Sequence, residues 1–196
     1  MLAKIKRFMR DLWLDKPALV TTETLTHYNV FTDGSFIEVQ RRGRSREKFG
    51  GYCAIVLDEN LAIGKILCGG MIDPSNSGDP EILAIVKVLQ HFKERTAFTI
   101  YTDCMYVVTF FEKIQNNDFY ANWKQMRTDS YKSSLKYLKL LDKLRELHNI
   151  EFAFIKSHSG ANLNETCDYL AKNFAYKQSS QPNKELETVD SYERKN

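Results

Sequence analysis

The order of the apolar segments constrains the fold of this 196-residue chain more than any other feature. Three β-rich runs come first, at residues 28–39, 50–57 and 62–71. The second and third are separated only by the turn residues 58–60, and a connection this short predicts an antiparallel meander. Helical and strand-like segments then alternate along the chain. We therefore expect an α/β fold with a mixed five-stranded sheet, in which a three-strand antiparallel meander and two parallel strands are flanked by helices.

The prediction for the second half depends on apolar periodicity. Apolar residues recur at helical spacing in four segments, which predicts helices at about residues 80–94, 105–114, 130–147 and 164–176. Two short apolar runs between them predict strands at residues 99–102 and 150–155.

The two ends of the chain differ in composition from this region. Residues 1–26 combine apolar residues at helical spacing with lysine and arginine, so we expect a basic amphipathic helix followed by a linker. Such a helix can dock an unknown partner, lie on a membrane surface or touch nucleic acid, and it can equally pack on the domain as an extra core helix. Residues 177–196 have few apolar side chains, which predicts a disordered polar tail. One domain, residues 27–176, lies between these ends.

Composition argues against several classes of protein. No apolar stretch approaches the roughly 20 residues of a membrane span, and none resembles the apolar core of a secretory signal. The four cysteines lack zinc-site spacing, so buried, reduced thiols are expected. The net charge of +3 permits a polyanionic partner without requiring one. We expect a monomer without stable membrane insertion, cytoplasmic or nucleoid-associated and not secreted.

Four acidic residues fall at the ends of predicted elements. Asp33 and Asp103 close predicted strands, whereas Glu81 and Asp168 lie in the first turns of predicted helices. Each alone has a plainer explanation as a turn residue, a helix cap or a complement to the helix dipole. Strand carboxyl ends and helix N-termini can converge on one rim of an α/β sheet, and four carboxylates gathered there need a cation. Their hard oxygen ligands suit Mg²⁺ or Mn²⁺, which in pairs about 3.5–4 Å apart serve phosphodiester hydrolysis.

Six short pieces of the chain form a series of motifs. They are FTDGS (31–35), GGY (50–52), PEILA (80–84), YTDCMYV (101–107), IKSHSG (155–160) and NETCDYLA (164–171). Each is a weak signal by itself, but in this order and spacing they resemble type 1 ribonuclease H over about residues 28–176. The resemblance implies the ribonuclease H-like fold. It also implies hydrolysis of the RNA strand of RNA–DNA hybrids, leaving 5′-phosphate and 3′-hydroxyl ends.

The same resemblance implies roles for the acidic residues. Asp33, Glu81, Asp103 and Asp168 match the family's catalytic, metal-binding quartet, which implies two Mg²⁺ ions with Mn²⁺ as a substitute. One ion, held by Asp33 and Asp168, would activate the attacking water. The other, held by Asp33, Glu81 and Asp103, would stabilise the departing 3′-oxygen. His158 matches the family residue that serves proton transfer or product release, although a lone histidine is usually an ordinary surface residue.

Substrate contacts are also implied. Groups near Gly34, Ser35, Asn76, Ser77 and Met105 would read the 2′-hydroxyl. Asn164 matches the asparagine that opens the family's last helix, where it would cap that helix or position the loop. The chain departs from the family at Asp79, where an arginine is usual. This change adds negative charge near the site, so we expect altered affinity or metal dependence.

Basic residues supply candidate phosphate contacts. Five of them gather in the glycine-containing stretch 41–48, which we expect to adjoin the acidic site: Arg41, Arg42, Arg44, Arg46 and Lys48. Lys124 follows Asn122 and Trp123 in a stretch similar to the family's basic protrusion. The lysine-rich helix at 130–145 is explained equally well as a solvated face.

The leading hypothesis is a Mg²⁺-dependent endonuclease that removes RNA primers or R-loops during DNA replication. A second hypothesis keeps the fold but changes the substrate to double-stranded RNA or DNA junctions, and Asp79 motivates it. A third is a catalytically silent nucleic-acid-binding module, against which the intact quartet argues.

Overall fold

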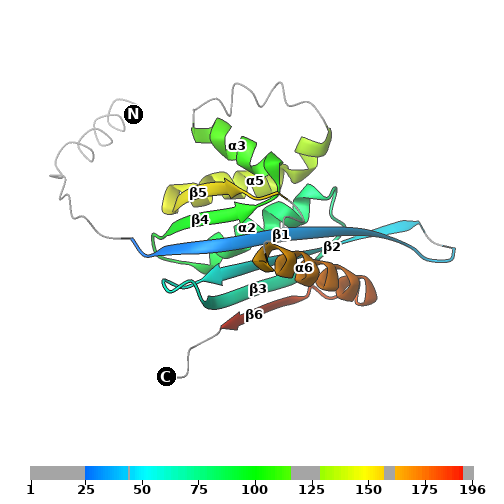
Figure 1. Cartoon of the computed structure of the whole chain (residues 1–196). Helices are drawn as coiled ribbons and strands as arrows, with labels where there is room; N and C mark the ends of the chain where they lie inside the picture. The colour runs from blue at the N-terminus through cyan, green and yellow to red at the C-terminus, as the bar shows by residue number, and fades with distance from the viewer. Residues whose placement is uncertain (1–24, 44, 116–128, 157–161, 192–196) are drawn as a thin grey trace, which may run out of the picture.

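Six strands form one mixed sheet in the order β5-β4-β1-β2-β3-β6 (Figure 1). The computed structural model describes residues 25–43, 45–115, 129–156 and 162–191. The antiparallel meander consists of β1 (His27–Gln40), β2 (Arg46–Leu57) and β3 (Ile63–Ile72). Next to it, β4 (Ala97–Thr102) pairs parallel with β1, and β5 (Asn149–Phe154) pairs parallel with β4. The predicted fold class is confirmed.

Four helices connect or follow these strands in the described residues. They are α2 (Gly78–His91), α3 (Met105–Gln115), α5 (Asp129–Leu147) and α6 (Asn162–Ser180). Each predicted helix is present, with ends that differ from the prediction by a few residues. Helix α6 lies across the meander (Figure 1), and α2 packs against α5 and the sheet.

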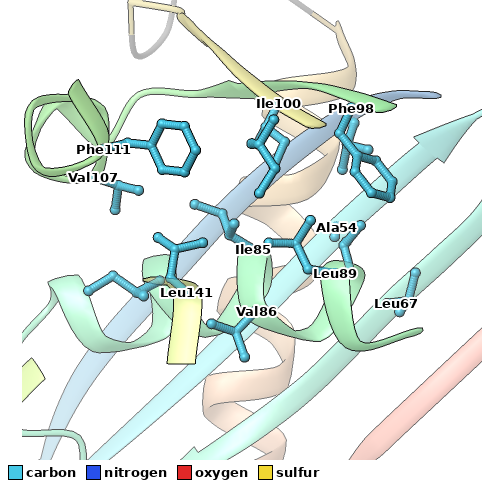
Figure 2. Close-up of a cluster of buried hydrophobic side chains, with 14 of the residues drawn as sticks. Ala54, Leu67, Ile85, Val86, Leu89, Phe98, Ile100, Val107, Phe111 and Leu141 are labelled. Carbon is cyan, nitrogen blue, oxygen red and sulfur yellow. The ribbon is translucent and has the colours of Figure 1, made fainter. Parts of the chain in front are cut away.

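The sheet separates two hydrophobic clusters, and the alternation of β2 shows why. Ala54 and Val56 belong to the larger cluster with α2 and α5, whereas Cys53, Ile55 and Leu57 belong to the cluster with α6. Side chains of consecutive strand residues point to opposite faces, so a continuous apolar run such as β2 can serve both clusters. Figure 2 shows the larger cluster, where α2 and the sheet enclose the core between them.

The first strand differs from the prediction in one respect that matters for the site. Asp33 does not end β1, because the strand continues to Gln40. The parallel pairing with β4 ends at Phe31 and Tyr101, whereas the antiparallel pairing with β2 continues through Asp33 and Cys53. Asp33 therefore lies just beyond the end of the parallel pairing with β4, in a part of β1 that is still paired with β2.

The C-terminal prediction is wrong for residues 177–191. Helix α6 continues to Ser180, and β6 (Glu187–Ser191) adds a sixth strand, antiparallel to β3. The strand has almost no apolar signal because its side chains at 187–190 are exposed. Backbone hydrogen bonds hold it, and these leave no trace in the pattern of residue types.

Two further findings bear on the sequence predictions. The expected N-terminal helix lies outside the described residues. Within the part of the chain that the structure describes, no helix has the length and apolar character that crossing a membrane requires.

Candidate active site

Three carboxylates meet where the parallel pairing of β1 and β4 ends. Asp33, Glu81 and Asp103 each offer an oxygen, and these atoms all lie within 4.8 Å of one another. Asp168 lines the same cavity of about 190 Å³, together with Gly34 and other residues of the rim. The four acids that the sequence singled out therefore share one site in the structure.

Asp33 and Glu81 come together because β1 and the first turn of α2 are in backbone contact. A Cβ atom at Gly34 would lie 2.3 Å from the Glu81 nitrogen and 2.6 Å from the Pro80 carbonyl carbon. No real Cβ atom tolerates such distances, so only glycine allows this approach. Gly34 thus places the buried Asp33, 5% exposed, beside the helix that carries Glu81.

Asp103 occupies the turn between β4 and α3. The Thr102 hydroxyl accepts a hydrogen bond from the Cys104 amide at 3.1 Å, and the Asp103 carbonyl accepts one from the Met105 amide at 3.0 Å. These bonds close the turn directly after the strand. The carboxylate is consequently held at the carboxyl end of β4, as the sequence predicted.

Burial and the neighbouring acids raise the pKa values of Asp33 and Glu81. Burial raises the pKa of Asp33 from 3.8 to about 7, and the negative charges of Asp103 and Asp168 add to the effect. Burial also raises the pKa of Glu81 well above its ordinary value. The negative charges of Asp33 and Asp103 raise this pKa further. A site in which ionisation is this unfavourable gains from a bound cation.

Lys172 supplies one positive charge to this site. Its ammonium group donates a hydrogen bond of 2.6 Å to Asp168, one turn earlier on α6, which raises the pKa of Lys172. The same charge lowers the pKa of Asp33. Lys172 was not among the residues predicted from the sequence, although a lysine four residues after an acid on a helix is a recognisable pair.

The donor atoms fit a divalent cation with oxygen ligands. Among the described residues, Glu81 Oε2 and Asn164 Oδ1 are buried without a hydrogen-bond partner. Both residues line the cavity. Buried polar atoms without a partner are costly, and a cation or its bound water would satisfy them. The residues present therefore fit Mg²⁺ or Mn²⁺.

Asn164 does not open the last helix, in contrast to the prediction. Helix α6 begins at Asn162, whose carbonyl accepts a hydrogen bond from the Thr166 hydroxyl at 2.7 Å. Asn164 is 4% exposed and faces the carboxylate cavity. Glu165 also lines this cavity, and the sequence analysis did not assign it a role.

The other predicted contacts have different surroundings. Ser35 is nearly buried on β1, and Met105 is 51% exposed at the start of α3. Asn76 and Ser77 lie in the connection between β3 and α2, where Ser77 is exposed. His158, Arg44 and Lys124 lie outside the described residues.

The sequence led us to expect that Asp79 adds negative charge near the site. In the structure this residue is buried. It is 1% exposed, and its carboxylate accepts hydrogen bonds from the Ser75 amide, at 2.8 Å, and from the Ser134 hydroxyl. The burial of Asp79 could not be foreseen from one sequence, because it depends on a contact with the distant helix α5. Ser134 was missed because nothing distinguishes a single serine within a lysine-rich helix.

The basic stretch is remote from the carboxylates, so the expectation that it adjoins them is wrong. Gln40 lies seven residues after Asp33 on β1, which corresponds to about 23 Å along a strand. Arg41 pairs with Glu47 at 3.2 Å, and Arg46 with Glu38 at 3.3 Å. Arg42 is exposed, and Lys48 belongs to β2.

Comparison with known proteins gives a consistent result. The family model of RNase H matches residues 26–176. A Ribonuclease H of Trichodesmium erythraeum is 31% identical over 151 residues, which cover 76% of this chain and 89% of that protein. A Ribonuclease H of Caldicellulosiruptor saccharolyticus is 31% identical over 128 residues, covering 63% of this chain and 83% of that protein.

Solved structures are similar in fold. LC9-RNase H1, described as a type 1 RNase H with the type 2 active-site motif, has a TM-score of 0.62 at 18% identity, covering 84% of this chain and 76% of that chain. A foamy viral protease-reverse transcriptase in complex with RNA/DNA hybrid has a TM-score of 0.57 at 15% identity, covering 83% of this chain and 22% of that one. At such identities these structures speak for the fold alone.

Proposed function

Because the chain belongs to the RNase H family, we propose that it is an endoribonuclease that hydrolyses the RNA strand of RNA–DNA hybrids. The observation that carries this proposal is the convergence of four carboxylates from β1, α2, β4 and α6 on one cavity. The names of its relatives support the choice of substrate. The expected products have 5′-phosphate and 3′-hydroxyl ends.

The proposed cofactor is Mg²⁺, in two ions, with Mn²⁺ as a substitute. Asp33, Glu81, Asp103 and Asp168 would hold it, and Asp33 would be shared between both ions. Bound there, the metal supplies an activated water and neutralises charge on the scissile phosphate. His158 remains the proposed group for proton transfer or product release.

The chain's own residues would bring the substrate to these carboxylates. Gly34 lines the cavity beside Asp33, and its backbone groups are the proposed contact for the sugar-phosphate chain. Ser35, Ser77 and Met105 are the proposed readers of the 2′-hydroxyl. Arg42 and Lys48, together with Arg41, Arg44, Arg46 and Lys124, remain proposed phosphate contacts farther along the duplex.

The biological setting is proposed from the same chemistry. The protein would act as a monomer in the cytoplasm or at the nucleoid, removing primers or R-loops. Residues 1–26 would form an extension that docks an unknown partner. The proposed domain then runs from residue 27 through β6, since this strand completes the sheet.

Cleavage of matched duplexes tests the proposal. Purified protein with Mg²⁺ is expected to cut the RNA of a hybrid and to leave duplex RNA and duplex DNA of the same sequence intact. Labelled products should carry a 5′-phosphate, and EDTA should abolish cleavage until Mg²⁺ or Mn²⁺ is added. Preferential cutting of duplex RNA or of a DNA junction would replace the hybrid as substrate. Binding without any cleavage would indicate a silent module.

A further inference from the structure

The connection between β3 and α2 is held by a connected set of hydrogen bonds, of which the one between Ser134 and Asp79 is buried and the others are partly buried. The Asp79 carboxylate accepts from the Ser75 amide at 2.8 Å and from the Ser134 hydroxyl. The Ser134 oxygen in turn accepts from the Asn76 amide nitrogen at 3.2 Å. The Asn76 carbonyl oxygen accepts from the Gly78 backbone at 2.8 Å. We call these four contacts the Asp79 network.

Burial gives the network its strength. Asp79 and Ser134 are each 1% exposed, so their hydrogen bonds are shielded from water. The carboxylate lies in the first turn of α2, where the helix dipole favours negative charge. Removal of either partner leaves a buried polar group unsatisfied, and the neighbouring backbone must then move.

The Asp79 network gives Asn76 and Ser77 different surroundings, although they are neighbours in the chain. Both polar ends of the Asn76 side chain are engaged within the loop. Ser77 is exposed, and its side chain makes no hydrogen bond to cap α2. The loop therefore uses Asn76 internally and presents Ser77, four residues before Glu81, to the outside.

We propose that Asp79 and Ser134 are positioning residues for substrate binding, because their network joins α5 to the loop and fixes Ser77 against the hybrid. This inference rests on the proposed function. It assigns α5 a part in substrate affinity and replaces the expectation that Asp79 disturbs the metal site by its charge. Asp79 and Ser134 would act through the loop, without touching the substrate or the carboxylates of the candidate active site.

Kinetics of Asp79→Asn, Ser134→Ala and the double variant test this inference. Asp79→Asn keeps the shape and one acceptor oxygen, whereas Ser134→Ala removes the hydroxyl. We expect KM for the hybrid to rise about tenfold, the change that corresponds to about 1.4 kcal/mol. The kcat and the Mg²⁺ concentration at half-maximal rate should stay within about twofold of wild type. The double variant should be hardly worse than the more affected single variant, because both changes break one network.

Matched controls separate positioning from general stability. Asp142→Asn removes a partly buried α5 carboxylate that pairs with Arg145, and Ser180→Ala removes a hydroxyl of α6, so neither should alter KM. Ser77→Ala should raise KM in the wild-type background but not in Ser134→Ala. A lower melting temperature with unchanged KM in the network variants would overturn the inference, as would a shift in Mg²⁺ dependence.

Hybrid binding distinguishes failure of this inference from failure of the proposed function. Fluorescence anisotropy with a labelled hybrid in EDTA requires no cleavage. We expect about tenfold weaker binding for Ser134→Ala than for wild type or Ser180→Ala. If wild type cleaves no hybrid, the proposed function fails. The positioning role then stands or falls with this binding difference, and equal affinities refute it.

Discussion

Asp33 is a buried carboxylate next to other acids, and its position explains both its chemistry and its effect on stability. The strand that carries it remains paired with β2 beyond the end of the parallel sheet, so the side chain cannot swing away from Glu81 and Asp103. Without a cation, these charges oppose folding. With a cation, they become its ligands.

This arrangement predicts how the metal-free protein responds to pH. The pKa of Asp33 is about 7 in the fold and 3.8 in the unfolded chain, so the folded state binds more protons between these values. The corresponding stability is present near pH 4 and is lost as pH rises through about 7. We expect Asp33→Asn to be more stable than wild type at pH 8 in EDTA, by a few kcal/mol. At pH 4 this advantage should vanish.

Thermal unfolding of both proteins at the two pH values measures this difference. Asp142→Asn, which removes a carboxylate paired with Arg145 on α5, is the control and should show no such gain. If Asp33→Asn gave no stabilisation at pH 8, the strained carboxylate cluster would be refuted.

Gly34 predicts a second effect at the residue scale. Gly34→Ala would drive a Cβ into the backbone of Pro80 and Glu81, so β1 and α2 must separate. We expect a loss of about 1–3 kcal/mol of stability and a fall in hybrid cleavage of at least about tenfold. Gly64→Ala is the control, because its nearest contact would be an ordinary 3.6 Å. Equal activity of the two variants would show that the close approach is unimportant.

The positions and roles of single residues differ in how well they could be predicted from the sequence. The acids could be placed because each stands at the end of a recognisable strand or helix. Asp79 was misread, since burial among Ser75 and Ser134 depends on a contact with a distant helix. Lys172 was overlooked although its spacing from Asp168 was available. The role of His158 stays a prediction.

At the scale of elements, the C-terminal segment shows how polar contacts can complete a sheet. Gln178 is fully buried and donates to the carbonyls of Gln181 and Lys184, at 3.0 and 2.7 Å. It also accepts from the Leu186 amide at 3.2 Å. One side chain thus closes the turn that brings β6 against β3.

Replacement of Gln178 tests this element. Gln178→Ala removes three side-chain hydrogen bonds to backbone groups and a fully buried side chain, so we expect a loss of about 2–4 kcal/mol of stability. Because β6 lies at the opposite side of β2 and β3 from Asp33, kcat at temperatures below unfolding should be unchanged. Denaturant unfolding and hybrid cleavage measure both quantities. Gln181→Ala is the control, since Gln181 takes part in this turn through its backbone amide and carbonyl, which the substitution keeps.

An unchanged stability of Gln178→Ala would contradict the role given to this side chain.

The elements themselves were largely predictable, because apolar periodicity marks a strand or helix that buries a face. The exception, β6, buries none of its described side chains at 187–190 and is held through its backbone. A pattern of residue types carries no signal for such a strand.

At the scale of the whole molecule, chain order determines where the site lies. A meander followed by alternating helices and strands places β4 beside β1 and parallel to it, so the carboxyl end of β4 lies where β1 leaves this pairing (Figure 1). Helix α2 from one face and α6 from the other then bring Glu81 and Asp168 to that edge. The sequence therefore predicted the rim of acids. The distance of the basic stretch from that rim follows from the length of β1 beyond Asp33, which the predicted strand at residues 28–39 already contained.

The central claim is that the carboxylates around Asp33 perform metal-dependent cleavage of the RNA in a hybrid. Single-turnover cleavage of a labelled RNA–DNA hybrid in Mg²⁺, by wild type and by Asp33→Asn side by side, tests it most directly. The account predicts rapid cleavage by wild type and a rate at least about a thousandfold lower for the variant, with the variant still folded. Cleavage by Asp33→Asn at the wild-type rate would contradict it.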